Sequence, residues 1–103
     1  MGYRPLTIIC TLAFLGTSLL PAFADSGPIP DTDMPGKDYQ NFELAQGPET
    51  CRETCMKDGK CEAWTWVKEG IQGKLRHCWL KNAVPAKVAN PCCVSGTRAA
   101  PID

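Results

Sequence analysis

The sequence predicts a small α+β domain that depends on disulfide bonds for its stability. Three observations predict this class: residues 48–57 have the pattern of one short helix, several short segments have the composition of strands, and six cysteines follow an N-terminal export signal. Removing 24 signal residues from the 103-residue chain leaves 79, which is the length of one domain with a small core.

Residues 1–24 have the features of a cleavable secretory signal peptide. The first residues include an arginine, residues 6–20 form an apolar run, and the Ala-Phe-Ala sequence at 22–24 places small residues where signal peptidase reads them. The apolar run is shorter than the roughly 20 residues that span a bilayer, so no stable membrane anchor is expected. Cleavage between Ala24 and Asp25 would deliver a secreted or periplasmic protein.

The charge of the mature chain is close to balanced. The chain has 11 basic and 11 acidic residues, and the signal peptide removes one arginine and no acidic residue. The sequence therefore lacks the basic excess of nucleic-acid and anionic-lipid binders. We expect no nucleic-acid partner, and the charge does not indicate which protein or glycan would bind.

The mature chain divides into a lead-in, one domain and a short tail. Residues 25–36 contain three prolines, two glycines and three aspartates, which predicts a flexible lead-in. The domain is expected at residues 37–99, followed by a tail at 100–103. Its predicted elements, besides the helix, are strands at 38–44, 61–68, 76–80 and 91–97, a hairpin turn at 69–73 and a loop at 81–90.

The predicted helix at residues 48–57 begins with a proline and a glutamate, which suit its first turn, and Gly59 follows its end. Cys51 and Cys55 are four residues apart and share one face of this helix. The same face is otherwise poor in large apolar side chains, and so short a helix is marginal alone. We therefore expect covalent bonds to hold the helix to the rest of the domain.

An even number of cysteines in a short exported chain predicts a disulfide framework. The six are Cys51, Cys55, Cys61, Cys78, Cys92 and Cys93. Zinc is the alternative, because these spacings together with His77 could supply ligands. Paired Cys-x2-Cys knuckles are absent, however, so no metal and no other cofactor is expected.

The sequence does not predict a catalytic site. His77 is the single histidine, and the two serines of the mature chain, Ser26 and Ser95, are not in a nucleophile-elbow motif. A thiol oxidoreductase would be expected to carry a Cys-x-x-Cys motif, which is missing. We therefore expect a protein that is not an enzyme.

Tryptophans and basic residues near the predicted hairpin are the candidate ligand-binding residues. Trp64 is expected in the core, whereas the residues that could face a ligand are Trp66, Trp79, Arg76 and Lys68. Tryptophan is favoured at interfaces, and its flat ring can also stack on a sugar. The alternative is that the tryptophans pack on the sheet and the basic side chains are simply solvated.

The order of motifs resembles the PAN/apple domain family. A helix bearing Cys-x3-Cys precedes a Cys-x-Ala-Trp-Thr-Trp strand at 61–66, and Cys-Trp-Leu-Lys follows at 78–81. Asp-Tyr-x-x-Phe at 38–42 and Cys-Val-Ser-Gly at 93–96 also match, so the resemblance covers roughly residues 31–97. The chain looks most like the short, single-domain PAN modules of bacteria.

This resemblance implies a twisted antiparallel sheet with one helix packed across it. It also implies disulfide bonds between Cys51 and Cys78 and between Cys55 and Cys61. Cys92 and Cys93 have no partner in the family pattern, so three pairings stay open: a bond between the two, an intermolecular bond, or a rearrangement that uses a helix cysteine. A bond between neighbours is strained, because consecutive Cα atoms are only about 3.8 Å apart.

The resemblance further implies non-catalytic binding of a protein or a carbohydrate, without identifying the ligand. The first alternative is an accessory subunit of an extracellular complex, such as an α2-macroglobulin-like protease-trapping system, because some short bacterial PAN modules accompany such proteins. A second alternative is a redox role for Cys92 and Cys93.

Overall fold

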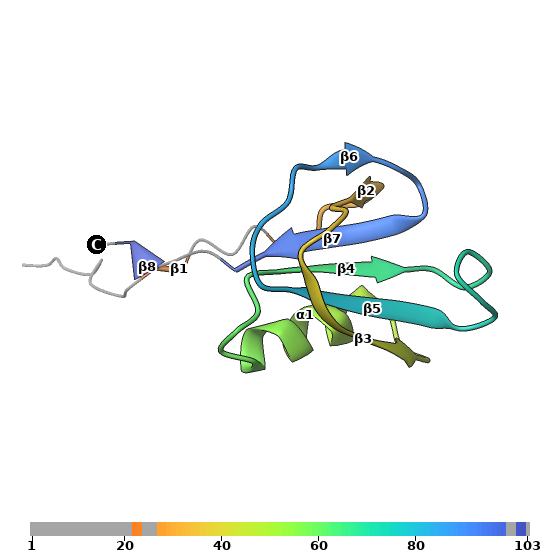
Figure 1. Ribbon diagram of the computed structural model, residues 1–103, viewed down its shortest axis with the longest axis horizontal. Helices are drawn as coiled ribbons and strands as arrows, with labels where there is room; N and C mark the ends of the chain where they lie inside the picture. Colours follow the sequence, from red (N-terminus) through yellow and green to blue (C-terminus); the bar gives the residue numbers. More distant parts are fainter. Residues whose placement is uncertain (1–21, 24–26, 99–100, 103) are drawn as a thin grey trace, which may run out of the picture.

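The computed structural model describes residues 22–23, 27–98 and 101–102 (Figure 1). The predicted cleavage junction lies outside the described residues, as does the predicted signal peptide except for two residues. These two form strand β1 (Ala22–Phe23), which pairs antiparallel with β8 (Pro101–Ile102) in the predicted tail. A chain cleaved after residue 24 would lack β1 and therefore this pairing.

A four-stranded antiparallel sheet forms the centre of the domain, with one helix across one of its faces (Figure 1). The helix is α1 (Pro48–Lys57), which has the predicted bounds. In spatial order the strands are β3 (Asp38–Leu44), β5 (Arg76–Lys81), β4 (Ala63–Val67) and β7 (Cys93–Thr97). The predicted α+β class and the packing of one helix on a twisted antiparallel sheet are confirmed.

Part of the segment that the sequence assigns to a flexible lead-in packs against this sheet. Strand β2 (Thr32–Asp33) pairs with β6 (Val88–Ala89), which lies in the predicted loop at 81–90. Ile29 exchanges two backbone hydrogen bonds with Ser95 of β7, and Met34 is completely buried. The prolines and glycines of this segment indicate its turns, but its pairing partners are distant in sequence and leave no local signal.

The strand register assigns neighbouring residues to the two faces of the sheet. Trp66 lies opposite Cys78, whereas Thr65 lies opposite Trp79. Because successive side chains of a strand point to opposite sides, Trp66 and Trp79 belong to different faces. We call the face covered by α1 the helix face and the other the opposite face.

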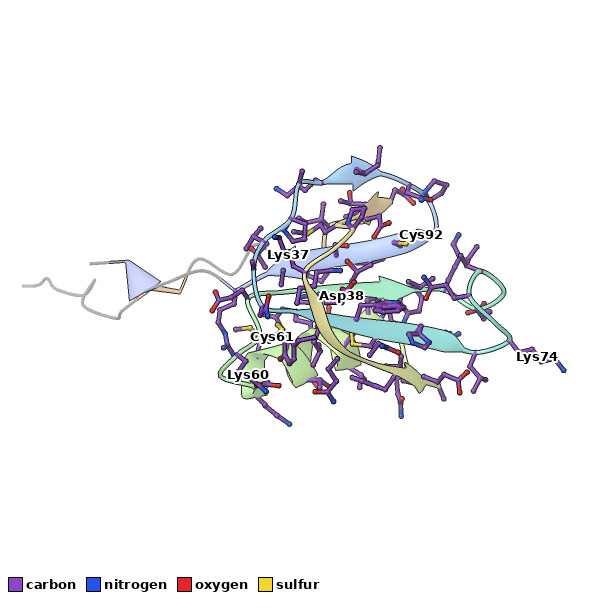
Figure 2. The ribbon with its side chains drawn as sticks, viewed as in Figure 1. Lys37, Asp38, Lys60, Cys61, Lys74 and Cys92 are labelled. Atoms are coloured by element: carbon purple, nitrogen blue, oxygen red, sulfur yellow. A yellow bond between two sulfur atoms is a disulfide. The ribbon has the colours of Figure 1, made fainter. Side chains whose placement is uncertain are left out.

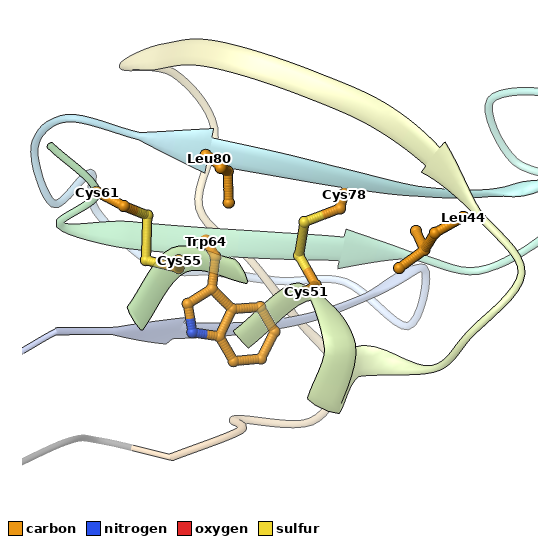
Figure 3. Close-up of a cluster of buried hydrophobic side chains, with 7 residues drawn as sticks. All are labelled: Leu44, Cys51, Cys55, Cys61, Trp64, Cys78 and Leu80. Carbon is orange, nitrogen blue, oxygen red and sulfur yellow. A yellow bond between two sulfur atoms is a disulfide. The ribbon is translucent and has the colours of Figure 1, made fainter. Parts of the chain in front are cut away.

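The helix face carries the main hydrophobic core (Figure 3). Disulfide bonds join Cys51 to Cys78 and Cys55 to Cys61, with Cα–Cα distances of 5.5 and 5.2 Å, so both predicted pairings are confirmed. All four cysteines are completely buried, as is Trp64 beside them. The core is therefore built around two cystines and one indole ring.

Gly96 of β7 lies directly against the ring of Trp64, the residue opposite it on the neighbouring strand β4. A Cβ atom at position 96 would lie 2.7 Å from Cζ2 of Trp64 and 2.8 Å from the carbonyl oxygen of Gly27. Neither neighbour is the end of a flexible chain, since one is a fully buried ring and the other is backbone. Glycine is thus the residue that allows β7 to approach the core tryptophan.

Replacing Gly96→Ala should destabilise the domain by about 1–3 kcal/mol, because the added methyl group overpacks the Trp64 site. Gly59→Ala is the matched control, since a Cβ there meets nothing within 4 Å and the effect should stay within about 0.5 kcal/mol. Denaturant unfolding of both variants measures the difference. Equal losses of stability in the two variants would show that the site around Trp64 can accommodate a methyl group at position 96.

The C-terminal end of α1 is tied to β3 and to the end of β7. Arg98 donates hydrogen bonds to the carbonyl oxygens of Cys55 and Asp58 at 3.0 and 2.9 Å. The Tyr39 hydroxyl donates to Oδ2 of Asp58 at 2.7 Å. Burial, followed by the hydrogen bond to Asp58 and its charge, raises the pKa of Tyr39 to about 12. The backbone N–H of Lys60 and then the Tyr39 hydroxyl lower the pKa of Asp58.

The Tyr39 hydroxyl should therefore lose its proton at a higher pH than an ordinary tyrosine. The other tyrosine, Tyr3, lies in the predicted signal peptide, so ultraviolet absorbance of the cleaved protein reports Tyr39 alone. We expect a midpoint near pH 12 rather than 10.0, and a lower one in Asp58→Asn that stays above 10.0 because the burial remains. Because the pKa of Tyr39 is raised in the folded state, its protonated hydroxyl contributes to the stability of the fold. This contribution is complete below the ordinary pKa of 10.0 and is lost as the pH rises through about 12. A midpoint near 10 in the folded wild type contradicts the contact.

Candidate functional site

The opposite face contains a pocket of about 450 Å³, which we call the Trp79 pocket. Strands β4 and β5 form its floor, the segment before β3 and the β4–β5 turn form two walls, and the approach to β7 forms a third. Its lining includes Asp33, Gly36, Asp38, Thr65, Val67, Ile71, Gln72, Trp79, Lys81, Asn90, Cys92 and Cys93. Figure 2 shows Asp38 at the start of β3 and Cys92 at the approach to β7.

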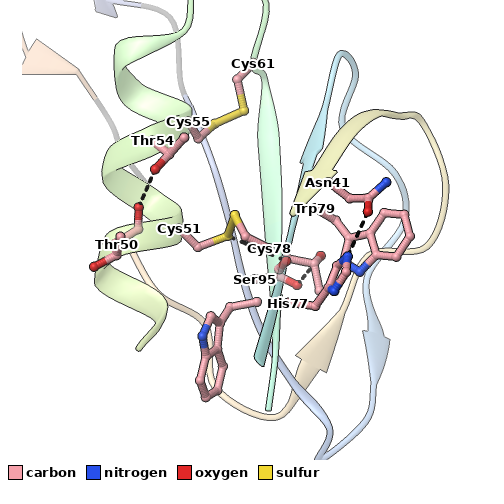
Figure 4. The surroundings of a disulfide bond; sticks show 12 residues. Asn41, Thr50, Cys51, Thr54, Cys55, Cys61, His77, Cys78, Trp79 and Ser95 are labelled. Atoms are coloured by element: carbon pink, nitrogen blue, oxygen red, sulfur yellow. Dashed lines mark hydrogen bonds between the residues drawn. A yellow bond between two sulfur atoms is a disulfide. The ribbon is translucent and has the colours of Figure 1, made fainter. Parts of the chain in front are cut away.

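Trp79 is held in the floor of this pocket by its neighbours on both sides. Its indole Nε1 donates to Oε1 of Gln72 in the hairpin turn at 2.8 Å. The ring of His77 lies 5.0 Å from the Trp79 ring, and Nε2 of His77 is 2.8 Å from Oδ1 of Asn41 (Figure 4). These contacts fix the orientation of a half-buried ring that still lines the pocket.

A chain of hydroxyl groups defines the hydrogen-bonding character of the floor. Ser95 Oγ donates to the carbonyl oxygen of Thr32 at 2.9 Å. The hydroxyls of Ser95 and Thr65 are 2.7 Å apart. Because the single hydroxyl proton of Ser95 is used toward Thr32, Thr65 must donate to Ser95. Thr65 lines the pocket, and its hydroxyl oxygen keeps lone pairs that can accept a hydrogen bond.

The cation in the pocket floor, Lys81, is already neutralised. Lys81 is only 2% exposed, and its Nζ forms an ion pair with Oδ1 of Asp38 and donates to the carbonyl oxygen of Gly36 at 3.2 Å. A buried ammonium group needs such partners, because an unpaired buried charge is costly. Lys81 and Asp38 thus contribute no net charge to the pocket.

Asp33 is different, because no basic side chain of the described residues forms an ion pair with it. One of its oxygens accepts a hydrogen bond from the backbone N–H of Met34 at 2.7 Å. Together with the paired Lys81 and Asp38, this carboxylate gives the lining residues a formal charge of −1. Asp33 was not among the candidate residues, because it lies in the Pro- and Gly-rich segment, where no local pattern marks a site residue.

Cys92 and Cys93 are joined to each other, which is one of the three pairings that the sequence left open. The backbone around them is held by two hydrogen bonds: Asn90 Oδ1 accepts from the N–H of Cys92 at 3.0 Å, and the Cys92 carbonyl accepts from the N–H of Lys68 at 3.1 Å. The ligand atoms of Asp33, Cys92 and Cys93 lie within 4.8 Å of one another. Disulfide sulfurs are not thiolate ligands, so in this form the three residues do not make a metal site.

The other three candidate residues gather elsewhere. Trp66, Lys68 and Arg76 line a smaller pocket of about 300 Å³, which we call the Trp66 pocket. The Arg76 guanidinium lies 5.9 Å from the Trp66 ring centroid, and its Nε is 2.9 Å from Oε1 of Glu69. Arg76 also donates to the carbonyl oxygen of Ala45 at 2.6 Å. The structure thus separates Trp79 from the rest of the predicted set, and Arg76 already has intramolecular partners.

The Cys92–Cys93 bond lines both pockets but closes almost no loop of chain, so it should contribute little to stability. We expect the Cys92→Ser, Cys93→Ser double variant to keep the fold, as judged by circular dichroism and denaturant unfolding. The matched control, Cys51→Ser with Cys78→Ser, opens a loop of 27 residues' separation and should cost about 3.5 kcal/mol. Comparable losses in the two variants would show that Cys92 or Cys93 bridges a long loop.

Comparisons with known proteins agree with the sequence motifs. Residues 32–81 match the family model of the PAN domain. Over 64 residues the chain is 30% identical to the uncharacterized protein L719 of Acanthamoeba polyphaga mimivirus, an alignment that covers 62% of this chain and 17% of that protein. No solved structure matches the chain at a significant level. The part of the chain that the structure describes contains no candidate transmembrane helix.

Proposed function

Residues 32–81 form a PAN domain, and from this premise we propose that the chain binds part of a protein or carbohydrate ligand in the Trp79 pocket. PAN domains are generally non-catalytic binding modules of this kind. The chain spans 17% of the length of the viral relative, so the proposal concerns this domain alone.

The observation that carries the proposal is the combination of shape and chemistry in the Trp79 pocket. Binding sites are concave and join apolar or aromatic walls to a few polar groups that orient the ligand. Here Trp79 supplies the aromatic surface, while the Thr65 oxygen and the Asp33 carboxylate supply acceptors. Trp79 is also fixed by the hydrogen bond to Gln72, so little of its freedom is lost when a ligand binds.

The Trp66 pocket is the less suitable site. The Trp66 indole donates to the carbonyl oxygen of Gln46 at 3.0 Å, and the charge of Arg76 is paired with Glu69. The hydrogen bond from Arg76 holds the pKa of the Glu69 carboxyl below its ordinary value, so this ion pair persists in mildly acidic solution. A ligand would have to displace these contacts to use Arg76.

We also propose that the protein acts outside the cytoplasm. Two buried disulfide bonds join α1 to β5 and to the segment before β4, and such bonds persist in oxidising compartments. The signal-like sequence at residues 1–24 provides a route of export. N-terminal sequencing of secreted material tests this route, since the chain should begin at Asp25.

The test of the site compares Trp79→Ala with Trp66→Ala. A ligand found by screening the secreted chain on glycan and peptide arrays is titrated against the wild type and both variants. Both rings are half-buried and both indole N–H groups are hydrogen-bonded, and Trp66 also packs against the core, so Trp66→Ala should cost at least as much stability as Trp79→Ala. Trp79→Ala should weaken binding about tenfold or more, as hot-spot tryptophans do, whereas Trp66→Ala should change it less than about twofold.

A larger loss of affinity in Trp66→Ala than in Trp79→Ala would indicate that the ligand binds in the Trp66 pocket, where Lys68 and Arg76 also lie. Unchanged affinity in both variants would reject the Trp79 pocket as the binding site. A thermal unfolding curve for each variant shows whether a loss of binding comes from a loss of fold.

A further inference from the structure

We propose that the Trp79 pocket recognises a cationic group, namely the side chain of a lysine or arginine in a protein partner. This inference rests on the proposed function for the location of the site and adds the chemistry of the ligand. It follows from the charge, the hydrogen-bonding groups and the aromatic surface that line the pocket.

The charge of the pocket favours a cation. Lys81 and Asp38 neutralise each other, which leaves Asp33 as the uncompensated charge of the lining. A ligand that covers the pocket removes water from this carboxylate, and a buried carboxylate is costly without a counter-charge. The hydroxyl groups of a neutral sugar would offset part of that cost by hydrogen bonds but would supply no counter-charge, and an anionic sugar would increase the cost.

The hydrogen-bonding groups agree with this assignment. An ammonium or guanidinium group has only donors, so it needs acceptors around it. Asp33 offers a second carboxylate oxygen beyond the one bonded to Met34, and the Thr65 hydroxyl spends its only proton on Ser95, so toward any other group it can act only as an acceptor. Hydrogen bonds between a carboxylate and a cationic donor are among the stronger ones in proteins.

The aromatic ring of Trp79 and the amide side chains of Gln72 and Asn90 suit a basic residue that is part of a peptide. A cation near the face of a tryptophan gains electrostatic attraction from the ring. The amide oxygens of Gln72 and Asn90 already accept hydrogen bonds from Trp79 and Cys92, so each amide keeps its N–H donors. Such donors suit the backbone carbonyls on either side of a basic residue. The lining therefore fits a basic side chain within a polypeptide.

Nuclear magnetic resonance of the secreted, isotopically labelled chain tests the inference directly. The probes are the N-acetyl amides of lysine and arginine, with the N-acetyl amide of glutamine as the neutral control. The cationic probes should cause saturable shifts of the Trp79 indole N–H and of the Met34 backbone N–H, with dissociation constants in about the millimolar range. The Trp66 indole signal should not move, and added salt should weaken the shifts.

Asp33→Asn removes the charge and keeps an oxygen for the Met34 N–H, so the fold should persist. It should weaken binding of the cationic probes about tenfold, the loss expected for a charge-assisted contact. Asp31→Asn is the matched control, because it makes the same charge change two residues away, on the Trp66 pocket. Asp31 has a positive φ of 51°, a conformation that asparagine tolerates, and binding should change less than about twofold.

Equal effects of the two variants would overturn the inference, since they would indicate only the general charge of the surface. Shifts of the Trp79 signal by neutral sugars but not by the cationic probes would also overturn it, while the pocket would remain a binding site. Failure of the proposed function looks different, because every ligand found on the arrays would then be insensitive to Trp79→Ala. Absence of any shift with the cationic probes at tens of millimolar, on the order of ten times the expected constant, also rejects the assignment.

Discussion

The attachment of one short helix by two disulfide bonds, one to β5 and one to the segment just before β4, is the constraint on which the rest of the structure depends. The only buried residues of α1 are Cys51 and Cys55, so the helix brings almost no other apolar surface to the core. In the chain-entropy model the bond from Cys51 to Cys78 contributes about 3.5 kcal/mol and the bond from Cys55 to Cys61 about 2.4 kcal/mol. A domain of this size has a total stability of only about 5–15 kcal/mol, so these bonds are a large share of it.

This mode of attachment makes the two faces of the sheet unequal. The helix face is filled by the two cystines and Trp64, and Gly96 lets β7 approach that ring closely. The opposite face has no helix among the described residues, and the segment that carries β2 and Met34 covers only part of it. The uncovered remainder is the Trp79 pocket, so the surface available for binding follows from where the disulfides place the helix.

Much of the framework could be predicted from sequence, because its signals are local. Proline at the start and glycine after the end gave the bounds of α1, and the resemblance to the PAN family gave both helix disulfides. The proposed site was predicted less well. Trp79 was among the candidate residues, but Asp33 and Met34 were not, because the segment that carries them pairs with β6 and β7, more than 50 residues away. Composition marks such a segment as turn-rich, yet only the tertiary pairing shows what it packs against.

The three disulfide bonds have different roles, and this difference explains how the pocket can be polar in so small a domain. Two bonds close loops and hold the helix, whereas the Cys92–Cys93 bond closes almost none and instead forms a rigid piece of pocket wall beside Asp33. Because stability comes from covalent bonds on the helix face, the opposite face can accommodate the ion pair of the buried Lys81 with the exposed Asp38, which contributes little net stability. A purely hydrophobic core of this size would have to use that face for apolar packing. Covalent stabilisation of one face thus leaves the other free for the polar groups of the proposed site.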